Sequence, residues 1–400
     1  MGKNALKYTC LFGGGAIRGA AYVGAIKAMD EVGIKPVNIG GSSVGAIVAA
    51  LWAVGYTYKE IKQVFMDVNY DLFRDIQFGL GPKFALSKGE LFLDWIRELI
   101  EVKFYGDDYK KGKNRAVTFA DIKKNLTIIT TNISEFECQE FSKTTTPDFE
   151  IATAVRISST MPGLMKPYEY NNTLLVDGDL QKSMPMWKLS PNFMKDDERI
   201  LEFRLEGDYD GSDKNALDYI NTVYSCITSI CTSYISQMYG NKDKFDYIIL
   251  NTGDVLLVDF NIPKDKREEL MQKGYEQTIE YFKKVLPQKK EKLLEEYYYI
   301  NKSLNKVEKL LSANKIPKAK FTLSEMFVDL CEYKDNIDRD IYEHIRVFSE
   351  IFDDNIKYPA LFGRVKFKDT ELVMTKLKEI INEVSSKVYE LESYLIKFPI

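Results

Sequence analysis

Short apolar segments alternate with stretches of helical periodicity up to about residue 285. Runs rich in β-branched and aromatic residues predict buried strands, and they fall at residues 7–12, 34–40, 127–132, 174–176, 199–204 and 247–250. The small apolar residues 44–52 predict a buried helix that stops near Gly55. This alternation predicts a layered α/β domain with a largely parallel sheet and a site at the carboxyl ends of its strands.

A different pattern begins at Pro287. Long charged stretches carry apolar residues three and four positions apart, which predicts helices over about 288–313, 323–354 and 369–396. One apolar stripe consists of Val373, Leu377, Ile380, Val384, Val388, Leu391 and Leu395. Such helices cover a neighbouring domain or form a homodimer interface, and a ligand-sensing or lid role is the alternative. We therefore predict two domains, at residues 5–285 and 286–400.

Two further segments have apolar patterns that bear on function. Residues 73–95 are aromatic and punctuated by glycine, as expected equally for a flap over an acyl-chain groove and for a packed loop. A second long helix is predicted from an apolar face that we assign to the core. That face comprises Leu217, Ile220, Val223, Tyr224, Ile227, Ile230, Tyr234 and Met238.

Composition and charge exclude several classes of function. A net charge of −4 argues against a nucleic-acid-binding protein. The five cysteines are scattered, without a C-x-x-C motif or a histidine cluster, so we expect neither a disulfide framework nor a metal site. The N-terminus lacks a signal-peptide core and no long apolar run appears, which predicts a cytoplasmic protein. The lysine-rich residues 289–320 fit a solvated helix face or transient contact with an anionic membrane surface.

Ser43 lies in the G-x-S-x-G pentapeptide of residues 41–45, where the predicted strand 34–40 meets the predicted helix 44–52. A sharp turn at this place exposes a serine hydroxyl, and its glycines allow the turn and close helix–strand packing. The competing interpretation is a glycine-rich turn that contains an incidental serine. The pentapeptide alone does not decide between the two.

A glycine run, Gly13-Gly14-Gly15, follows the first predicted strand. Backbone N–H groups that converge after a strand suit an oxyanion or a phosphate. Arg18 stands where a dinucleotide fingerprint needs its third glycine, and Ala20 follows Gly19 where a phosphate-binding loop needs lysine. We therefore expect an oxyanion loop and no nucleotide cofactor, with a plain structural turn as the alternative.

Ser43 needs a base that accepts the proton of its hydroxyl. His344, the single histidine, lies in the charged C-terminal region, on what we interpret as a solvated helix face. A carboxylate of suitable pKa within hydrogen-bond reach also serves as a base. Asp177 follows the apolar run 174–176 and precedes Gly178, although Asp-Gly alone is better interpreted as an ordinary hairpin turn.

In combination, these motifs resemble those of the patatin-like phospholipase family. Residues 13–19 are similar to its glycine-rich loop, the pentapeptide to its nucleophile turn, and Asp177-Gly178 to its aspartate motif. Residues 154–163 resemble the family segment that leads through a proline to the aspartate strand. The resemblance covers roughly residues 5–285 and implies a three-layer α/β/α domain, followed here by an all-helical extension.

The resemblance also implies roles for individual residues. Ser43 would be the nucleophile and Asp177 the base of a dyad without histidine. The oxyanion would be bound by backbone N–H groups of Gly13, Gly14, Gly15 and Val44. The residues expected to support the site are Arg18, Gly19, Gly41, Gly45, Gly178 and Asp179. Asp179 departs from the family pattern, which has a small residue there, and a second carboxylate beside Asp177 would raise the pKa of one of the pair.

The function implied is hydrolysis of fatty-acyl esters of phospholipids, without a cofactor or metal, by an enzyme that is peripheral to the membrane when it acts. Two alternatives stay open. One is an effector, for example in bacterial antiviral defence, whose membrane-degrading activity is switched on by a signal or ligand. The other is a catalytically weak scaffold that acts through its helical extension.

Overall fold

The computed structural model describes residues 7–69, 87–180, 198–208, 219, 222–227, 229–230, 233, 245–255, 262–333, 337–359 and 364–397. The chain divides into two compact units, and the division falls between Glu280 and Tyr281. The first unit contains the α/β elements and the second contains the C-terminal helices.

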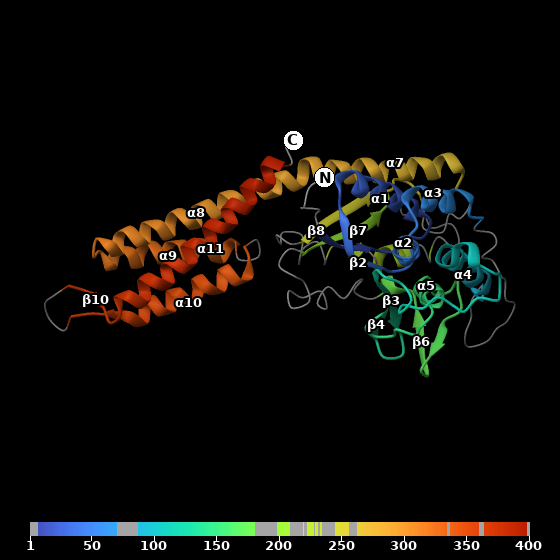
Figure 1. The fold of residues 1–400 in the computed structure, drawn as a ribbon, viewed down its shortest axis with the longest axis horizontal. Helices are drawn as coiled ribbons and strands as arrows, with labels where there is room; N and C mark the ends of the chain where they lie inside the picture. Colours follow the sequence, from blue (N-terminus) through green and yellow to red (C-terminus); the bar gives the residue numbers. More distant parts are fainter. Residues whose placement is uncertain are drawn as a thin grey trace. The chain divides into compact units, whose positions relative to one another are not determined.

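One mixed sheet forms the centre of the first unit (Figure 1). Its strands are β1 (Lys7–Phe12), β2 (Lys35–Gly41), β3 (Asn125–Asn132), β4 (Glu137–Ser142), β5 (Tyr168–Tyr170), β6 (Thr173–Val176), β7 (Glu198–Glu206) and β8 (Phe245–Asn251). Their order is β5-β6-β3-β2-β1-β7-β8, and β4 pairs with β3 off this path. Strands β3, β2, β1, β7 and β8 are parallel, whereas β4, β5 and β6 pair antiparallel. The largely parallel sheet predicted from the sequence is confirmed.

Strand β1 lies in the middle of this sheet and is buried on both faces. Tyr8, Cys10 and Phe12 point to one face and Thr9 and Leu11 to the other, and all five side chains are buried. A central parallel strand covered on both sides reads as a continuous apolar run, which is why the sequence predicts it well. Its end places the glycine run beside the end of β2.

Helices cover the sheet. They are α1 (Ala20–Val32), α2 (Val44–Ala53), α3 (Tyr58–Asp67), α4 (Glu90–Tyr105), α5 (Ile151–Ser158) and α7 (Lys264–Glu280). Helices α1 and α7 run side by side (Figure 1) and approach so closely that a Cβ on Gly24 would lie 1.8 Å from Met271 O. Helix α2 packs on β1, β2 and β3 through alanines such as Ala46 and Ala50, which are fully buried.

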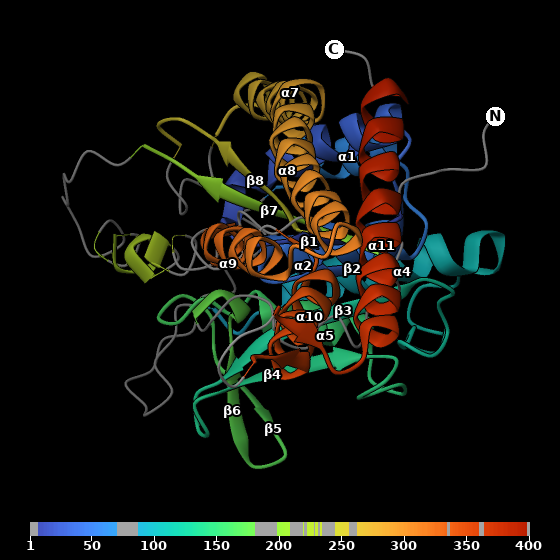
Figure 2. The same ribbon diagram turned by 90° about the vertical axis from the view of Figure 1, so that its left-hand side faces the viewer.

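Strand β3 brings the ends of β2 and β6 together, and Figure 2 shows β6 with β5 as a hairpin beside it. Since β4 pairs with β3 along Thr127–Asn132, β2 and β6 must share the opposite edge of β3. On that edge Gly41, the last residue of β2, pairs with Ile128, and Val176, the last residue of β6, pairs with Thr131. Because the two strands run toward each other, the residues that follow them meet.

The second unit is formed by α8 (Leu286–Ser312), α9 (Ile316–Tyr333), α10 (Arg339–Asn355) and α11 (Thr370–Lys397), with a two-stranded ladder of β9 (Ile356–Lys357) and β10 (Lys366–Phe367). A π-helical segment, Tyr281–Val285, precedes α8. Each helix in the described part of the chain is too short or too polar to span a membrane.

Two expectations for this region are refined. The predicted helix over 323–354 is wrong as one element, because α9 ends at Tyr333 and Asp338 caps a new helix by accepting from Asp340 N. The stripe from Val373 to Leu391 is buried, and it packs on apolar side chains of the other helices of the same unit. A homodimer through these helices would therefore have to use their other faces.

Candidate active site

Ser43 occupies the turn between β2 and α2, as its pentapeptide predicts. Its backbone has φ 52° and ψ −127°, a conformation that residues other than glycine rarely adopt and that costs roughly 1–3 kcal/mol. Space requires the flanking glycines: a Cβ on Gly41 would lie 2.2 Å from Gly45 O, and one on Gly45 would lie 2.0 Å from Phe12 O. The tight turn therefore sets Ser43 directly before the first residue of α2.

The end of α5 holds this turn in place. Ser43 N donates to Ser158 Oγ over 3.0 Å, and the Ser158 hydroxyl in turn donates to Ile129 O on β3 over 2.5 Å. Ser159 Oγ donates to Ser43 O over 3.3 Å. Residues 154–163 resemble a segment of the family, but the sequence did not indicate what these residues do. In the structure, the end of this segment's helix supports the turn that contains Ser43.

Asp177 is fully buried at the end of β6, and burial together with the charge of Asp179 raises its pKa to about 7. The hydroxyls of Ser43 and Tyr224 face the carboxylate and oppose this rise, because a hydroxyl directed at a carboxylate favours its charged form. Asp177 Oδ1 accepts from Asp179 N over 2.9 Å. Its Oδ2 has no hydrogen-bond partner among the described residues. A carboxyl with this pKa exchanges a proton near neutral pH.

The Asp177-Gly178 pair does not form the hairpin turn that was the alternative interpretation. Gly178 starts a 3₁₀ turn, Gly178–Leu180. A Cβ at Gly178 would lie 2.2 Å from Ile129 O and 3.1 Å from Ser42 Cβ. The pair therefore lies directly against β3 and the nucleophile turn, where only glycine fits.

The glycine loop differs in part from expectation. Gly13 N donates to Phe203 O over 3.0 Å, and Gly14 N donates to Asp179 Oδ2 over 2.8 Å. Neither group is thus a free donor, contrary to the prediction that both would face an oxyanion. A Cβ at Gly14 would lie 2.4 Å from Asp179 Oδ2, so the side chain of Asp179 fills the space beside this glycine.

Gly15 and Val44 are the remaining predicted donors. Gly15 has φ 147°, a backbone conformation that favours glycine, and Val44 begins α2. Within the described ranges, neither backbone N–H donates a hydrogen bond. Free N–H groups at the start of a helix favour a developing negative charge.

Arg18 and Gly19 act on the elements around the loop. Arg18 Nε donates to Val255 O over 2.6 Å, so its buried guanidinium anchors the turn after the glycine loop to the residues beyond β8 rather than to the loop itself. A Cβ at Gly19 would lie 2.2 Å from Val44 Cγ2. The start of α1 therefore lies directly on the start of α2.

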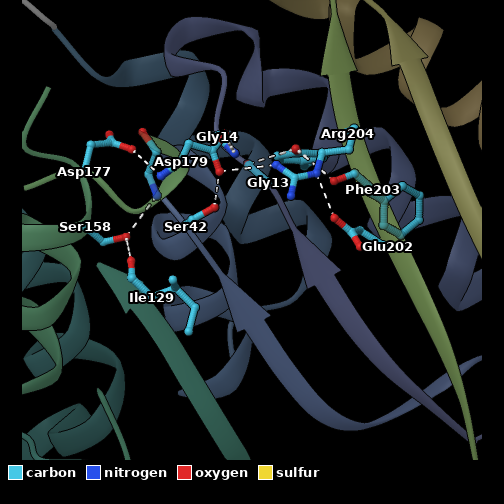
Figure 3. A network of polar contacts seen from close by, with 12 residues as sticks. Gly13, Gly14, Ser42, Ile129, Ser158, Asp177, Asp179, Glu202, Phe203 and Arg204 are labelled. Carbon is cyan, nitrogen blue, oxygen red and sulfur yellow. Dashed lines mark hydrogen bonds and ion pairs between the residues drawn. The ribbon is translucent and has the colours of Figure 1, made fainter. Parts of the chain in front are cut away.

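Asp179 joins the glycine loop to a buried arginine (Figure 3). Its Oδ1 accepts from Ser42 Oγ over 2.5 Å and from Arg204 Nη1 over 3.2 Å. Arg204 Nε donates to Glu202 Oε1 over 2.7 Å. The sequence did not single out Ser42, Arg204 or Glu202, because alternation along β7 indicates only a strand.

Tyr224 is a second side chain that sequence reasoning placed elsewhere. It was assigned to a core face, and its ring is indeed buried against Met161, with Ala16 and Leu180 alongside. Its hydroxyl, however, is buried without a hydrogen-bond partner among the described residues. Burial and the negative charge of Asp177 raise the pKa of Tyr224 well above its usual range. The apolar stripe predicted that the ring is buried, whereas helical periodicity carries no information about where the hydroxyl lies.

Other candidate chemistry lies outside this site. His344 contacts Glu383 Oε2 at 2.9 Å within the second unit, on the exposed helix surface that the sequence predicts. Among the described residues, no group of three or more His, Cys, Asp or Glu side chains is arranged to hold a metal ion. Most of the candidate flap, residues 70–86, lies outside the described residues.

Comparisons with known proteins point to one family. The family described as patatin-like phospholipase matches residues 11–188. An uncharacterized protein, R571, of Acanthamoeba polyphaga mimivirus is 31% identical over 65% of this chain and 89% of that protein. The probable lipid hydrolase 463L of invertebrate iridescent virus 6 is 29% identical over 44% of this chain and 61% of its own length. Lysophospholipase NTE1 of Candida glabrata is 25% identical over 63% of this chain, which corresponds to 12% of that larger protein.

The matched region contains the glycine loop, the nucleophile turn and the aspartate motif in the order that the family has them. The mimivirus relative extends the similarity over nearly its whole length. This chain belongs to the patatin-like phospholipase family.

Proposed function

We propose that the protein is a lipid acyl hydrolase of the phospholipase A or lysophospholipase type, with Ser43 as nucleophile and Asp177 as base. The observation that carries the proposal is the pairing of a serine on a strained turn with a buried carboxyl whose pKa is about 7. Such a carboxyl accepts a proton near neutral pH and returns it, which is what a base without histidine must do.

In the first half of the reaction, ionised Asp177 takes the proton of Ser43 Oγ as the oxygen attacks the acyl carbonyl carbon. The C–O bond to the alcohol then breaks, and the proton on Asp177 passes to the departing alkoxide. The products are an acyl-serine and a free alcohol, which is a lysophospholipid or a glycerol derivative.

In the second half, Asp177 takes a proton from a water molecule, and the resulting hydroxide attacks the acyl-serine. The bond to Ser43 Oγ breaks, the oxygen regains the proton from Asp177, and a fatty acid leaves. No cofactor or metal enters either step of this proposal.

Negative charge develops on the carbonyl oxygen in both halves. The N–H groups of Gly15 and Val44 are the donors that fit it, since those of Gly13 and Gly14 are already bonded. Removing one such donor costs roughly 2.7–4 kcal/mol in comparable sites. The substrate resides in a membrane, so the proposal includes transient contact with a membrane surface.

The test is hydrolysis of vesicles of mixed phospholipids, read by lipid profiling, together with labelling by a fluorophosphonate. Wild-type protein is expected to release fatty acid and to be labelled on Ser43, and Ser43→Ala is expected to lose both. Ser142→Ala is the matched control, because Ser142 is a buried serine on β4 that bonds Glu140 and Thr145. Full esterase activity in Ser43→Ala would refute the proposal.

The same assay separates the alternatives. A scaffold predicts a protein that neither hydrolyses lipid nor reacts with the fluorophosphonate. A regulated effector predicts negligible activity that appears on addition of a small molecule or partner. Lipid profiles from the active protein would also identify the head group and acyl position that it prefers.

A further inference from the structure

Four ionisable side chains are buried together at the carboxyl ends of the central strands. Asp177 and Glu202 are 0% exposed, and Asp179 and Arg204 are 2% exposed. Three carboxyl groups and a single guanidinium thus lie in this cluster, and the guanidinium pairs with two of the carboxyls, Asp179 and Glu202. Buried charges of this kind are costly unless they are paired and hydrogen-bonded, so their arrangement needs an explanation.

Arg204 connects two of these carboxyls from the neighbouring strand. Arg204 and Glu202 are two residues apart on β7 and therefore point to the same face of the sheet. Arg204 Nε donates to Glu202 Oε1 over 2.7 Å and its Nη1 donates to Asp179 Oδ1 over 3.2 Å. The two negative charges raise the pKa of Arg204, so the guanidinium stays charged despite its burial.

Asp179 links the ends of four strands. Its carboxylate accepts from Gly14 N after β1, from Ser42 Oγ after β2 and from Arg204 on β7. Its backbone N donates to Asp177 Oδ1 after β6. A Cβ at Gly13 would lie 2.5 Å from Arg204 Nη1, so the guanidinium also lies directly against the glycine loop.

We propose that Asp179, Arg204 and Glu202 form a buried charged array that positions the glycine loop and sets the proton affinity of the base Asp177. Asp179 and Arg204 are positioning residues in this proposal, since they act through Gly14, Ser42 and Asp177. The inference rests on the proposed dyad function and deepens it. It also explains the departure from the family pattern: the carboxylate at position 179 replaces a small residue and has a matching cation on β7.

The groups that face this cluster determine whether a substitution raises or lowers the pKa of Asp177. Asp177 faces Asp179, Ser43 and Tyr224. Asp179 lies among Arg204, Glu202, Tyr22 and Tyr247 on α1, β7 and β8. Removing the charge of Asp179 deletes a negative charge beside Asp177 and must lower the pKa of that base. Replacing Arg204 by lysine keeps the cation but loses the fork that contacts two carboxylates.

The experiment measures the rate of fluorophosphonate labelling against pH in wild-type protein, Asp179→Asn and Arg204→Lys. Labelling requires ionised Asp177, so the rate rises with pH through the pKa of that group. Asp179→Asn is expected to move the midpoint down by about one pH unit. Arg204→Lys is expected to keep the midpoint and to lower the plateau rate about tenfold through misplacement of the loop.

Asp246→Asn is the matched control. Asp246 is a fully buried carboxylate on β8 that pairs with Arg199 at 3.0 Å, and the described contacts of that pair do not include the glycine loop. This variant is expected to leave the midpoint unchanged. An unchanged midpoint in Asp179→Asn, an equal shift in Asp246→Asn, or a higher plateau rate of labelling in Asp179→Ala than in wild type would each overturn the proposal.

A second measurement does not depend on activity. Thermal unfolding is followed against pH in wild-type protein, Asp177→Asn, Asp179→Asn and the double variant. The array predicts that Asp179→Asn moves the pH window in which Asp177 affects stability, whereas the two substitutions would act independently without it. If wild-type protein is neither labelled nor active, the proposed function fails. The comparison of the four proteins by thermal unfolding still tests the array, because it does not require activity.

Discussion

Gly14 N lies 2.8 Å from Asp179 Oδ2, and this hydrogen bond joins the middle of the glycine loop to the 3₁₀ turn Gly178–Leu180. The contact leaves no room for a side chain on Gly14, because a Cβ there would lie 2.4 Å from the same carboxylate oxygen and 3.0 Å from Ser43 Cβ. The glycine is therefore required by its neighbours and not by its backbone, since its φ is not positive.

We expect Gly14→Ala to lower the rate of fluorophosphonate labelling by about 100-fold, because the added methyl group displaces the loop and Asp179 relative to Ser43. Labelling rates of purified protein check this. Gly33→Ala is the control: Gly33 has φ 85° but nothing lies within 4 Å of the added Cβ, so only backbone strain is introduced. Gly33→Ala should lose about 1 kcal/mol of stability and keep its labelling rate. Equal rates in Gly14→Ala and wild type would contradict the steric argument.

Ser158 supports the nucleophile turn through a hydroxyl that bonds Ser43 N and Ile129 O. Ser158→Ala leaves both backbone groups without this partner, and buried groups that lose a partner cost roughly 1–3 kcal/mol each. We expect a lower melting temperature and a kcat reduced about tenfold. KM should change little, because Ser158 acts on the turn and does not touch the lipid. A variant with normal kcat would show that the turn holds its shape without α5.

The residues of the candidate site were predictable from sequence where the chemistry is local. Ser43 and Asp177 each follow a strand of regular apolar pattern, and the turn glycines beside them mark where the chain must bend. Arg204 offers no such signal, because its partner Asp179 arrives from another strand and pairs across the sheet. A linear pattern does not record which charged side chain on a strand meets which other one.

The fold was likewise predictable where it depends on local sequence patterns. The alternation of strands and helices predicts the parallel part of the sheet, where each strand is followed by its own crossover. The meeting of β2 and β6 on one edge of β3 depends on pairing between distant segments, which periodicity does not encode. In the C-terminal unit, the apolar period runs through the break before Asp338, so a single helix was predicted where two exist.

Tyr224 should affect the acid side of the pH profile in the direction opposite to Asp179. Its hydroxyl lowers the pKa of Asp177 by interacting with the carboxylate. Tyr224→Phe removes that interaction, so the pKa of Asp177 rises and the midpoint of labelling moves above about pH 7. The measurement is the labelling rate against pH.

Tyr56→Phe is the control for this substitution. The Tyr56 hydroxyl donates to Leu99 O over 2.8 Å on α4, so its loss should cost about 1 kcal/mol of stability without moving the midpoint. A midpoint that falls in Tyr224→Phe would refute the assigned interaction.

Asp177 makes the stability of the protein depend on pH in an unusual direction. Its pKa is raised from the ordinary value of 3.8 to about 7 on folding, so the folded state holds a proton that the unfolded state has released across this interval. Stability therefore falls as the pH rises from about 4 to about 7, and above that window the protein carries a buried charge that destabilises it.

Asp177→Asn removes this ionisation while it keeps the shape of the side chain. We expect the variant to be more stable than wild type above about pH 7, by up to roughly 4 kcal/mol if the whole difference in pKa is realised. The advantage should shrink as the pH falls and should vanish well below pH 3.8, the ordinary pKa, where wild-type Asp177 is neutral in both states. Urea unfolding at a series of pH values measures this directly. The variant is also expected to lose labelling of Ser43 at every pH, so one substitution would raise stability and abolish reactivity. An Asp177→Asn protein that is less stable than wild type at alkaline pH would show that the folded protein does not disfavour ionised Asp177.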